Sequence, residues 1–104
     1  MKARDLVMDA DTRVYVDKER FLSEYHREIR AWKNIITAGI QDNVPVMELV
    51  RDDERYHGRA LGFLIAMECL PLSVMSGAEI ETLRKELCDA RNWCDEQINI
   101  YDEI

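Results

Sequence analysis

The sequence has few of the residues that interrupt helices. Its 104 residues include only four glycines and two prolines. Apolar residues make up 47% of the chain and charged residues 34%, which excludes a disordered or fibrous protein. A chain of this length fits one domain with one modest hydrophobic core. We therefore expect a single folded domain that is rich in helix.

Long apolar runs and a cysteine framework are also missing. The longest apolar stretch, residues 60–67, is far shorter than the about 20 residues that span a bilayer. Near the N-terminus Asp5 precedes any apolar segment, which is atypical of a secretion signal. The three cysteines (Cys69, Cys88 and Cys94) have no metal-ligand spacing, which indicates free thiols in a reducing compartment. We expect a cytoplasmic protein without a membrane segment.

Basic charge is scarce in the C-terminal third of the chain. The net charge is −7 at pH 7. Residues 76–104 hold eight acidic and three basic side chains, a net charge of −5, whereas residues 17–40 hold four acidic and five basic ones. This balance disfavours binding to nucleic acids and to anionic membranes. A protein partner, and a basic one in particular, is favoured instead.

Apolar residues recur at helical spacing in the first and last parts of the chain. Steps of three and four residues predict a first helix from residue 18 to residue 37 or 38, with Asp17 as its N-cap. Gly39, followed by residues 41–43, supplies the stop and turn signals. The first stripe consists of Leu22, Tyr25, Ile29, Trp32, Ile36 and Ile40, and the last of Ile80, Leu83, Leu87, Ala90, Cys94, Ile98 and Tyr101.

Two prolines delimit a second helix, and a capping box begins the third. Pro45 suits a first helical turn, and Pro71 excludes further continuation. Between them the charged run 51–54 interrupts the apolar face, so this helix either continues or breaks and restarts near Asp52. Ser76 and Glu79 form the capping box of the third helix, whose stripe extends nearly to the C-terminus.

These patterns predict an all-α fold, a small antiparallel three-helix bundle over residues 17–104. Residues 12–16 are β-branched or aromatic apart from one arginine, so residues 1–16 are expected to form a short extended arm. The third helix would be about 37 Å long, more than a globule of this size covers. Its end is therefore expected to pack on another chain or to project as a tail.

A small-residue strip lies on the second helix. Gly58, Gly62 and Ala66 follow one another at intervals of four residues. Because glycine inside a helix costs about 1 kcal/mol relative to alanine, the two glycines indicate a backbone that approaches closely. The neighbour is either another part of the chain or a second subunit. The second alternative predicts a homodimer.

Acidic residues and a histidine support one catalytic alternative. Glu54 and His57 have the Glu-x-x-His spacing of carboxylate-bridged di-metal bundles. Glu24 and Glu28 form an acidic i,i+4 pair of the kind that holds magnesium, and Asp53 belongs to a second acidic cluster. A complete site needs a second Glu-x-x-His, which the sequence lacks, and nearby arginines neutralise both clusters. A metal-dependent helical enzyme using these five residues is therefore the alternative, and the leading interpretation includes neither metal nor cofactor.

The third helix carries the predicted partner-binding surface. Trp93 lies one residue off the apolar stripe, so we expect it to be exposed, and exposed tryptophans anchor interfaces. With Tyr101 and Ile104 it would form an apolar edge beside the acids Asp95 and Glu96.

The sequence thus favours a small acidic interaction module over an enzyme. It contains no nucleophile with a base, no glycine-rich phosphate loop and no basic groove. Adaptor, assembly factor and inhibitor are the expected roles, and such proteins are frequent among phage and mobile-element products. The predicted partner-binding residues are Trp93, Asp95, Glu96, Tyr101, Gly58 and Gly62.

Overall fold

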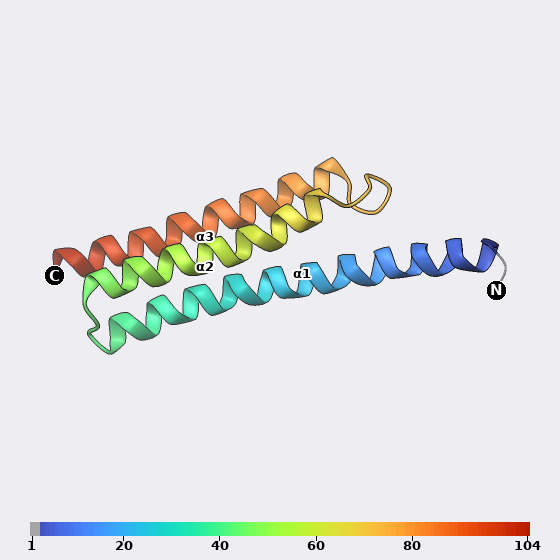
Figure 1. The fold of residues 1–104 in the computed structure, drawn as a ribbon. Helices are drawn as coiled ribbons and strands as arrows, with labels where there is room; N and C mark the ends of the chain where they lie inside the picture. The colour runs from blue at the N-terminus through green and yellow to red at the C-terminus, as the bar shows by residue number, and fades with distance from the viewer. Residues whose placement is uncertain (1–2) are drawn as a thin grey trace.

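The computed structural model consists of three helices that run up, down and up (Figure 1). It describes the backbone of residues 3–104 and the side chains of residues 17–104. The helices are α1 (Ala3–Gln41), α2 (Val46–Glu68) and α3 (Gly77–Glu103). Successive helices are antiparallel, and residues 3–104 contain no strand. The predicted all-α three-helix bundle is therefore confirmed.

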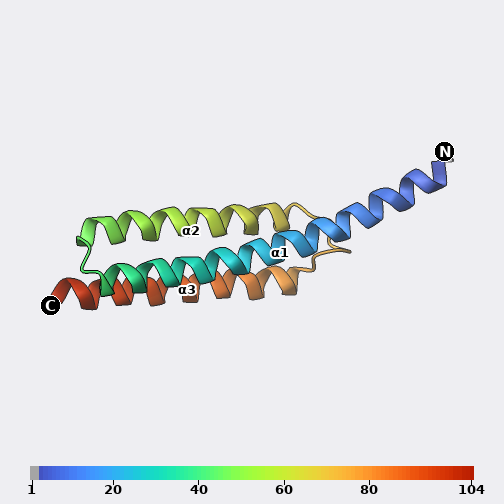
Figure 2. The same cartoon turned by 90° about the horizontal axis from the view of Figure 1, so that it is seen from below.

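α1 is much longer than the sequence pattern predicts. It has 39 residues, and its N-terminal part extends past the connector between α2 and α3 (Figure 2). The prediction of an extended arm over residues 1–16 is therefore wrong in conformation, since the backbone is helical from Ala3, while residues 1 and 2 lie outside the described part. No glycine or proline occurs between Ala3 and Ala38. The β-branched residues lower helix propensity by only about 0.5 kcal/mol each, which does not stop the helix.

The projecting element is thus α1 and not α3. The molecule measures 66 × 25 × 15 Å, and its radius of gyration of 17.8 Å exceeds the value of about 13 Å for a compact chain of this length. The end of α3 packs against the turn between α1 and α2, where the Tyr101 hydroxyl donates a 2.7 Å hydrogen bond to the Val44 carbonyl. The expected tail at the end of α3 is therefore wrong.

The left-handed residue that terminates α1 is Asn43 and not Gly39. Asn43 has a φ of 56°, and its N–H and that of Val44 donate to the carbonyls of Ile40 and Gly39 at 3.2 and 3.0 Å. These two bonds form a Schellman motif. Gly39 lies inside the helix, where a Cβ atom would come within 2.5 Å of Leu49 Cδ2. This glycine therefore allows α2 to approach α1 closely.

α2 is one continuous helix, so the alternative with a break near Asp52 is wrong. Asp52 pairs with Arg55 of the same helix at 2.8 Å, which satisfies its charge on the surface. α2 ends at Glu68, ahead of Pro71. The predicted cap of α3 is confirmed, because Ser76 Oγ accepts the Glu79 N–H at 3.2 Å.

The core is built from the predicted apolar stripes. No helix of the described part has the length and apolarity needed to cross a membrane. The most buried core residues are Tyr25, Trp32, Ile36, Leu49, Ala60, Met67, Met75, Ala90 and Cys94.

Lys18 of α1 holds the connector that precedes α3. Its Nζ donates a 2.7 Å hydrogen bond to the Val74 carbonyl and forms a 2.9 Å ion pair with Glu79.

The strip on α2 faces away from the rest of the chain. A Cβ atom at Gly58 or at Gly62 would have no neighbour within 4 Å. Close approach by another part of the described chain is therefore wrong for both glycines, whereas contact with a second subunit stays a prediction.

The open space at these glycines makes their effect on stability testable. Gly58→Ala and Gly62→Ala are each expected to raise the free energy of unfolding by about 1 kcal/mol, because alanine favours the helix and nothing opposes its methyl group. Urea denaturation measures this change. Gly39→Ala is the matched control, because its methyl group meets buried Leu49, and we expect a loss of about 1 to 3 kcal/mol from overpacking. If the Gly58/Gly62 double variant is instead less stable and no longer forms a dimer, a second subunit covers the strip.

Candidate functional site

A buried carboxylate lies at the centre of the bundle. Asp53 of α2 is only 4% exposed, and its Oδ1 accepts a 2.8 Å hydrogen bond from Nε1 of Trp32 on α1, which is fully buried. Burying a charge is costly unless the charge is paired and hydrogen-bonded. The indole N–H satisfies one of the two carboxylate oxygens.

Arg91 of α3 lies between Asp53 and a second carboxylate, that of Asp95. Its Nε is 3.8 Å from Asp53 Oδ2 and 3.3 Å from Asp95 Oδ2. Both distances exceed the about 2.8 Å of a strong charge-assisted hydrogen bond. One guanidinium is therefore shared between two carboxylates without a strong hydrogen bond to either. The three side chains carry a net charge of −1 when both acids are ionised.

The surroundings of Asp53 favour its protonated form. Its pKa is raised from 3.8 to about 7, first by burial and then by a hydrogen bond with the Asp95 carboxyl, against the opposing effects of Trp32 and Arg91. Near pH 7 the Asp53 carboxyl is therefore protonated in about half of the molecules.

The neighbouring titratable groups are uncharged near neutral pH. The His57 ring lies 5.6 Å from the Trp32 ring, and burial, followed by the charge of Arg91, lowers the pKa of His57. Burial, followed by the charge of Asp53, raises the pKa of the Cys94 thiol to about 12. A protonated, buried thiol is a poor nucleophile.

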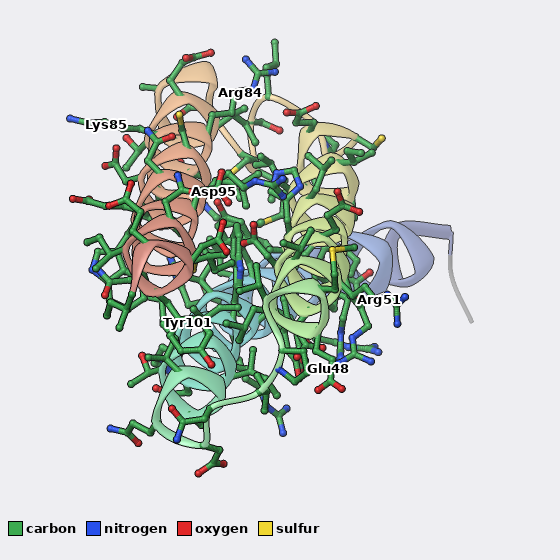
Figure 3. All side chains as sticks on the ribbon, turned by 90° about the vertical axis from the view of Figure 1, so that its left-hand side faces the viewer. Glu48, Arg51, Arg84, Lys85, Asp95 and Tyr101 are labelled. Atoms are coloured by element: carbon green, nitrogen blue, oxygen red, sulfur yellow. The ribbon has the colours of Figure 1, made fainter. Side chains whose placement is uncertain are left out.

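An open groove between α2 and α3 connects this cluster to solvent. We call it the acid groove, and Figure 3 shows Asp95 pointing into the space between the two helices. At about 220 Å³ it is smaller than the about 300 to 1,000 Å³ of pockets for drug-sized ligands. It suits a single side chain or a similarly small group. Its lining residues are Val50, Asp53, Arg91, Asp95, Ile98 and Asn99.

A second hollow lies on the surface of α2 alone. It is lined by Glu48, Arg51, Asp52 and Arg55, of which the first two are labelled in Figure 3. Arg55 pairs with Asp52 at 2.8 Å, so charges on the same helix already neutralise each other. This hollow is a solvated charged surface.

Large apolar side chains are exposed along one row of α3. Trp93 is 37% exposed, Ile100 49% and Ile104 99%, and the row formed by these three is called the outer edge below. Nζ of Lys33 on α1 lies 5.7 Å from the centre of the Trp93 ring. Tyr101, which was expected on this edge, turns inward to the α1–α2 turn. Ile100 takes its place, and its spacing of seven residues from Trp93 could have identified it.

The other predicted partner-binding residues lie on separate surfaces. Glu96 is exposed between Trp93 and Ile100, on the outer edge side of α3. Asp95 lines the acid groove with Arg91. The two glycines lie on the outward face of α2. The structure therefore does not unite these residues into one patch.

The five residues of the metal-enzyme alternative are not brought together. Glu24 and Glu28, both on α1, each form an ion pair with an arginine, at 3.2 and 3.0 Å. Asp53 and His57 both contact Trp32 from α2. Among the described residues no group of three or more histidine, cysteine or acidic side chains is placed to hold a metal ion. The five residues are Glu24, Glu28, Asp53, Glu54 and His57.

Three comparisons with known proteins gave no match. Neither protein-family models, nor curated proteins, nor solved structures resemble this chain at a significant level. Function therefore has to be inferred from the chemistry of the outer edge and of the acid groove.

Proposed function

We propose that this chain is a protein-binding module that uses the outer edge of α3 to bind a basic amphipathic helix of a partner protein. The alignment of Trp93, Ile100 and Ile104 supports this proposal most directly. Single exposed apolar residues are ordinary on protein surfaces. Three large ones at intervals of seven and four residues form one row about 16 Å long, and its spacing matches that of the apolar face of a helix.

Charge beside the outer edge favours a basic partner. Asp89, Glu96 and Glu103 are exposed and follow one another at intervals of seven residues. Positions three or four residues apart are neighbours on a helix, so this acidic row runs alongside the apolar row. Complementary rim charges speed association and exclude partners of like charge. Lysine or arginine residues bordering the partner's apolar face would meet these three carboxylates.

Binding alone accounts for the roles expected from the sequence. An adaptor, an assembly factor and an inhibitor all need a specific contact surface, and none of them needs a catalytic group. Trp93 is the expected energetic centre, because tryptophan is enriched among the residues that contribute most to interfaces.

Two designed helical peptides test the proposal. They share one apolar face, and one carries lysines on its flanks where the other carries glutamates. We expect saturable binding of the lysine peptide in calorimetry and none of the glutamate peptide, because the acidic row repels the latter. Trp93→Ala is expected to weaken binding by about 30-fold, the equivalent of a 2 kcal/mol hot spot.

Met47→Ala is the matched control, because Met47 is an apolar residue on α2 that is 62% exposed. It should leave the affinity unchanged. Equal affinity of the Trp93→Ala variant and the unaltered protein, or equal binding of both peptides, would refute the proposal.

A further inference from the structure

We infer that the partner helix carries basic residues on one flank of its apolar face and acidic residues on the other, and that this division fixes the direction in which it binds. The inference rests on the proposed function, because it concerns the same outer edge. It follows from exposed charges of opposite sign on the two sides of this edge, acidic on α3 and basic on α1.

Contacts between α1 and α3 show that α1 runs beside the outer edge. His26 pairs with Glu86 at 2.9 Å, and the Lys33 ammonium lies 5.7 Å from the centre of the Trp93 ring. The members of each pair are 60 residues apart in sequence, so the two helices run parallel and in register. Near the other end of the edge, Tyr101 donates a hydrogen bond to the turn that follows α1. α1 therefore borders the outer edge along its length.

The α1 side of the outer edge is basic. Lys33 and Arg30 are both exposed, and neither forms an ion pair within residues 17–104. Arg30 lies four residues after His26 and three before Lys33, so the helical period places it on the side of α1 that faces α3. The next exposed residue on this side, Thr37, is uncharged. Two cations without an acidic partner therefore line this side of the edge.

The acidic row lies on the opposite side of the outer edge. At about 100° per residue, Trp93 lies about 100° around α3 from buried Cys94, and Glu96 lies about 160° away in the same direction. Since Trp93 contacts α1, the edge separates the acidic row from α1. Lys85 precedes this row, but it lies eight residues before Trp93, about 12 Å from the edge.

The three carboxylates of the acidic row are as unpaired as the two cations of α1. Within residues 17–104 none of them forms an ion pair. A helix that lies along the edge places one flank over these acids and the other over Lys33 and Arg30. Like charges that face each other across an interface weaken binding, so a helix with lysines on both flanks complements only one side.

The same arrangement determines the direction of the bound helix. Turning a helix end over end keeps its apolar face on the edge but exchanges its two flanks. A helix with one basic and one acidic flank therefore complements the surface in only one of the two directions.

A third peptide extends the calorimetric test of the proposed function. The split peptide has the apolar face of the lysine peptide, with lysines on one flank and glutamates on the other. At low ionic strength we expect it to bind about fivefold more tightly than the lysine peptide, because its glutamates replace lysines that face Lys33 and Arg30. A peptide with the same charged residues mixed on both flanks is the matched control for net charge, and it should bind more weakly than the split peptide.

Charge reversal on α1 tests the same preference from the side of the protein. Lys33→Glu and Arg30→Glu are each expected to abolish the preference for the split peptide, and the double variant to reverse it. The Arg30 variant is included because Lys33 also contacts the Trp93 ring. Arg20→Glu is the matched control, since Arg20 is an exposed cation of α1 about 20 Å from Lys33, and it should leave the preference unchanged.

A nitroxide label at the N-terminus of the peptide reports the direction of binding. In the split peptide and in a version with its two flanks exchanged, the label is expected to broaden NMR signals at opposite ends of the outer edge. These are the signals of Trp93 in one case and of Ile104 in the other.

The outcomes distinguish this inference from the proposed function. Absence of binding by every peptide would refute the proposed function and this inference with it. Equal affinity of the split and lysine peptides, an unchanged preference in the double variant, or the same label position for both versions of the split peptide would overturn the inference alone. In these cases the outer edge would still be a partner-binding surface.

Discussion

Trp32→Ala is expected to lower the free energy of unfolding by about 3 to 5 kcal/mol. Trp32 is fully buried and is the largest side chain of the core. Its removal leaves a cavity and also deprives Asp53 of its hydrogen-bond donor. Domains of this size are stable by only about 5 to 15 kcal/mol, so the variant should lose a large part of its stability. Urea denaturation followed by circular dichroism measures the loss, and a loss below about 1 kcal/mol would contradict the burial of Trp32.

Trp32→Phe separates the hydrogen bond from the packing. Phenylalanine fills most of the space but has no N–H, so a loss of about 1 to 3 kcal/mol is expected from the unsatisfied Asp53 carboxylate. The loss should be larger at pH 8 than at pH 5, because the indole N–H stabilises the ionised form of Asp53. Trp93→Phe is the matched control on the surface, and its effect should stay within about 0.5 kcal/mol at both pH values.

Asp53→Asn is expected to raise the free energy of unfolding strongly at pH 8, whereas the two Trp32 substitutions lower it. The pKa of Asp53 is about 7 in the folded chain and 3.8 for an unperturbed group. Between about pH 4 and pH 7 the Asp53 carboxyl is ionised in the unfolded chain but still protonated in the folded chain. The stability contributed by protonated Asp53 is therefore complete below about pH 4 and is lost as the pH rises toward 7.

Asparagine imitates the protonated carboxyl and does not titrate. Its amide oxygen can accept from Trp32, and its amide nitrogen can donate to Asp95. The variant should match the unaltered protein near pH 4 and exceed its free energy of unfolding by about 2 to 4 kcal/mol at pH 8. Urea denaturation at both pH values measures this difference. Asp89→Asn is an exposed control that should show no such dependence, and lower stability of Asp53→Asn at pH 8 would contradict the raised pKa.

The bundle was predictable because each helix buries one regular apolar stripe. The cap at Ser76 was readable too, since a capping box involves only residues that are close in sequence. The length of α1 was not predicted, because β-branched residues near the N-terminus suggested an extended segment although no strong helix breaker follows. The role of Gly39 was also hidden, as it depends on contact with Leu49 of another helix.

The position of Asp53 was the main omission at the site. Within the run 51–54 it reads as one of several surface charges. It nevertheless lies four residues after Leu49 and seven before Ala60, which is the buried stripe of α2. That spacing was a usable signal for an inward carboxylate. Its partner Trp32 could not be identified from spacing, because that contact depends on how α1 and α2 pack.

The exposure expected for Trp93 is found, whereas Tyr101, expected beside it, turns inward. Trp93 lies one residue before buried Cys94, so it falls beside the stripe and reaches the surface. Tyr101 follows Ile98 by three residues and thus continues the buried stripe, which explains its inward hydrogen bond to Val44. A stricter reading of helical spacing would have selected Ile100.

Titration of the Asp53 carboxyl carbon by NMR from pH 4 to pH 9 tests most directly whether burial at the centre of the bundle keeps this carboxyl protonated up to neutral pH. A midpoint near pH 7 is predicted, together with a shift of the Trp32 indole signal at the same pH. If Asp53 instead titrates near its ordinary value of about 3.9, the carboxylate is a simple ion pair with Arg91, which would contradict the account.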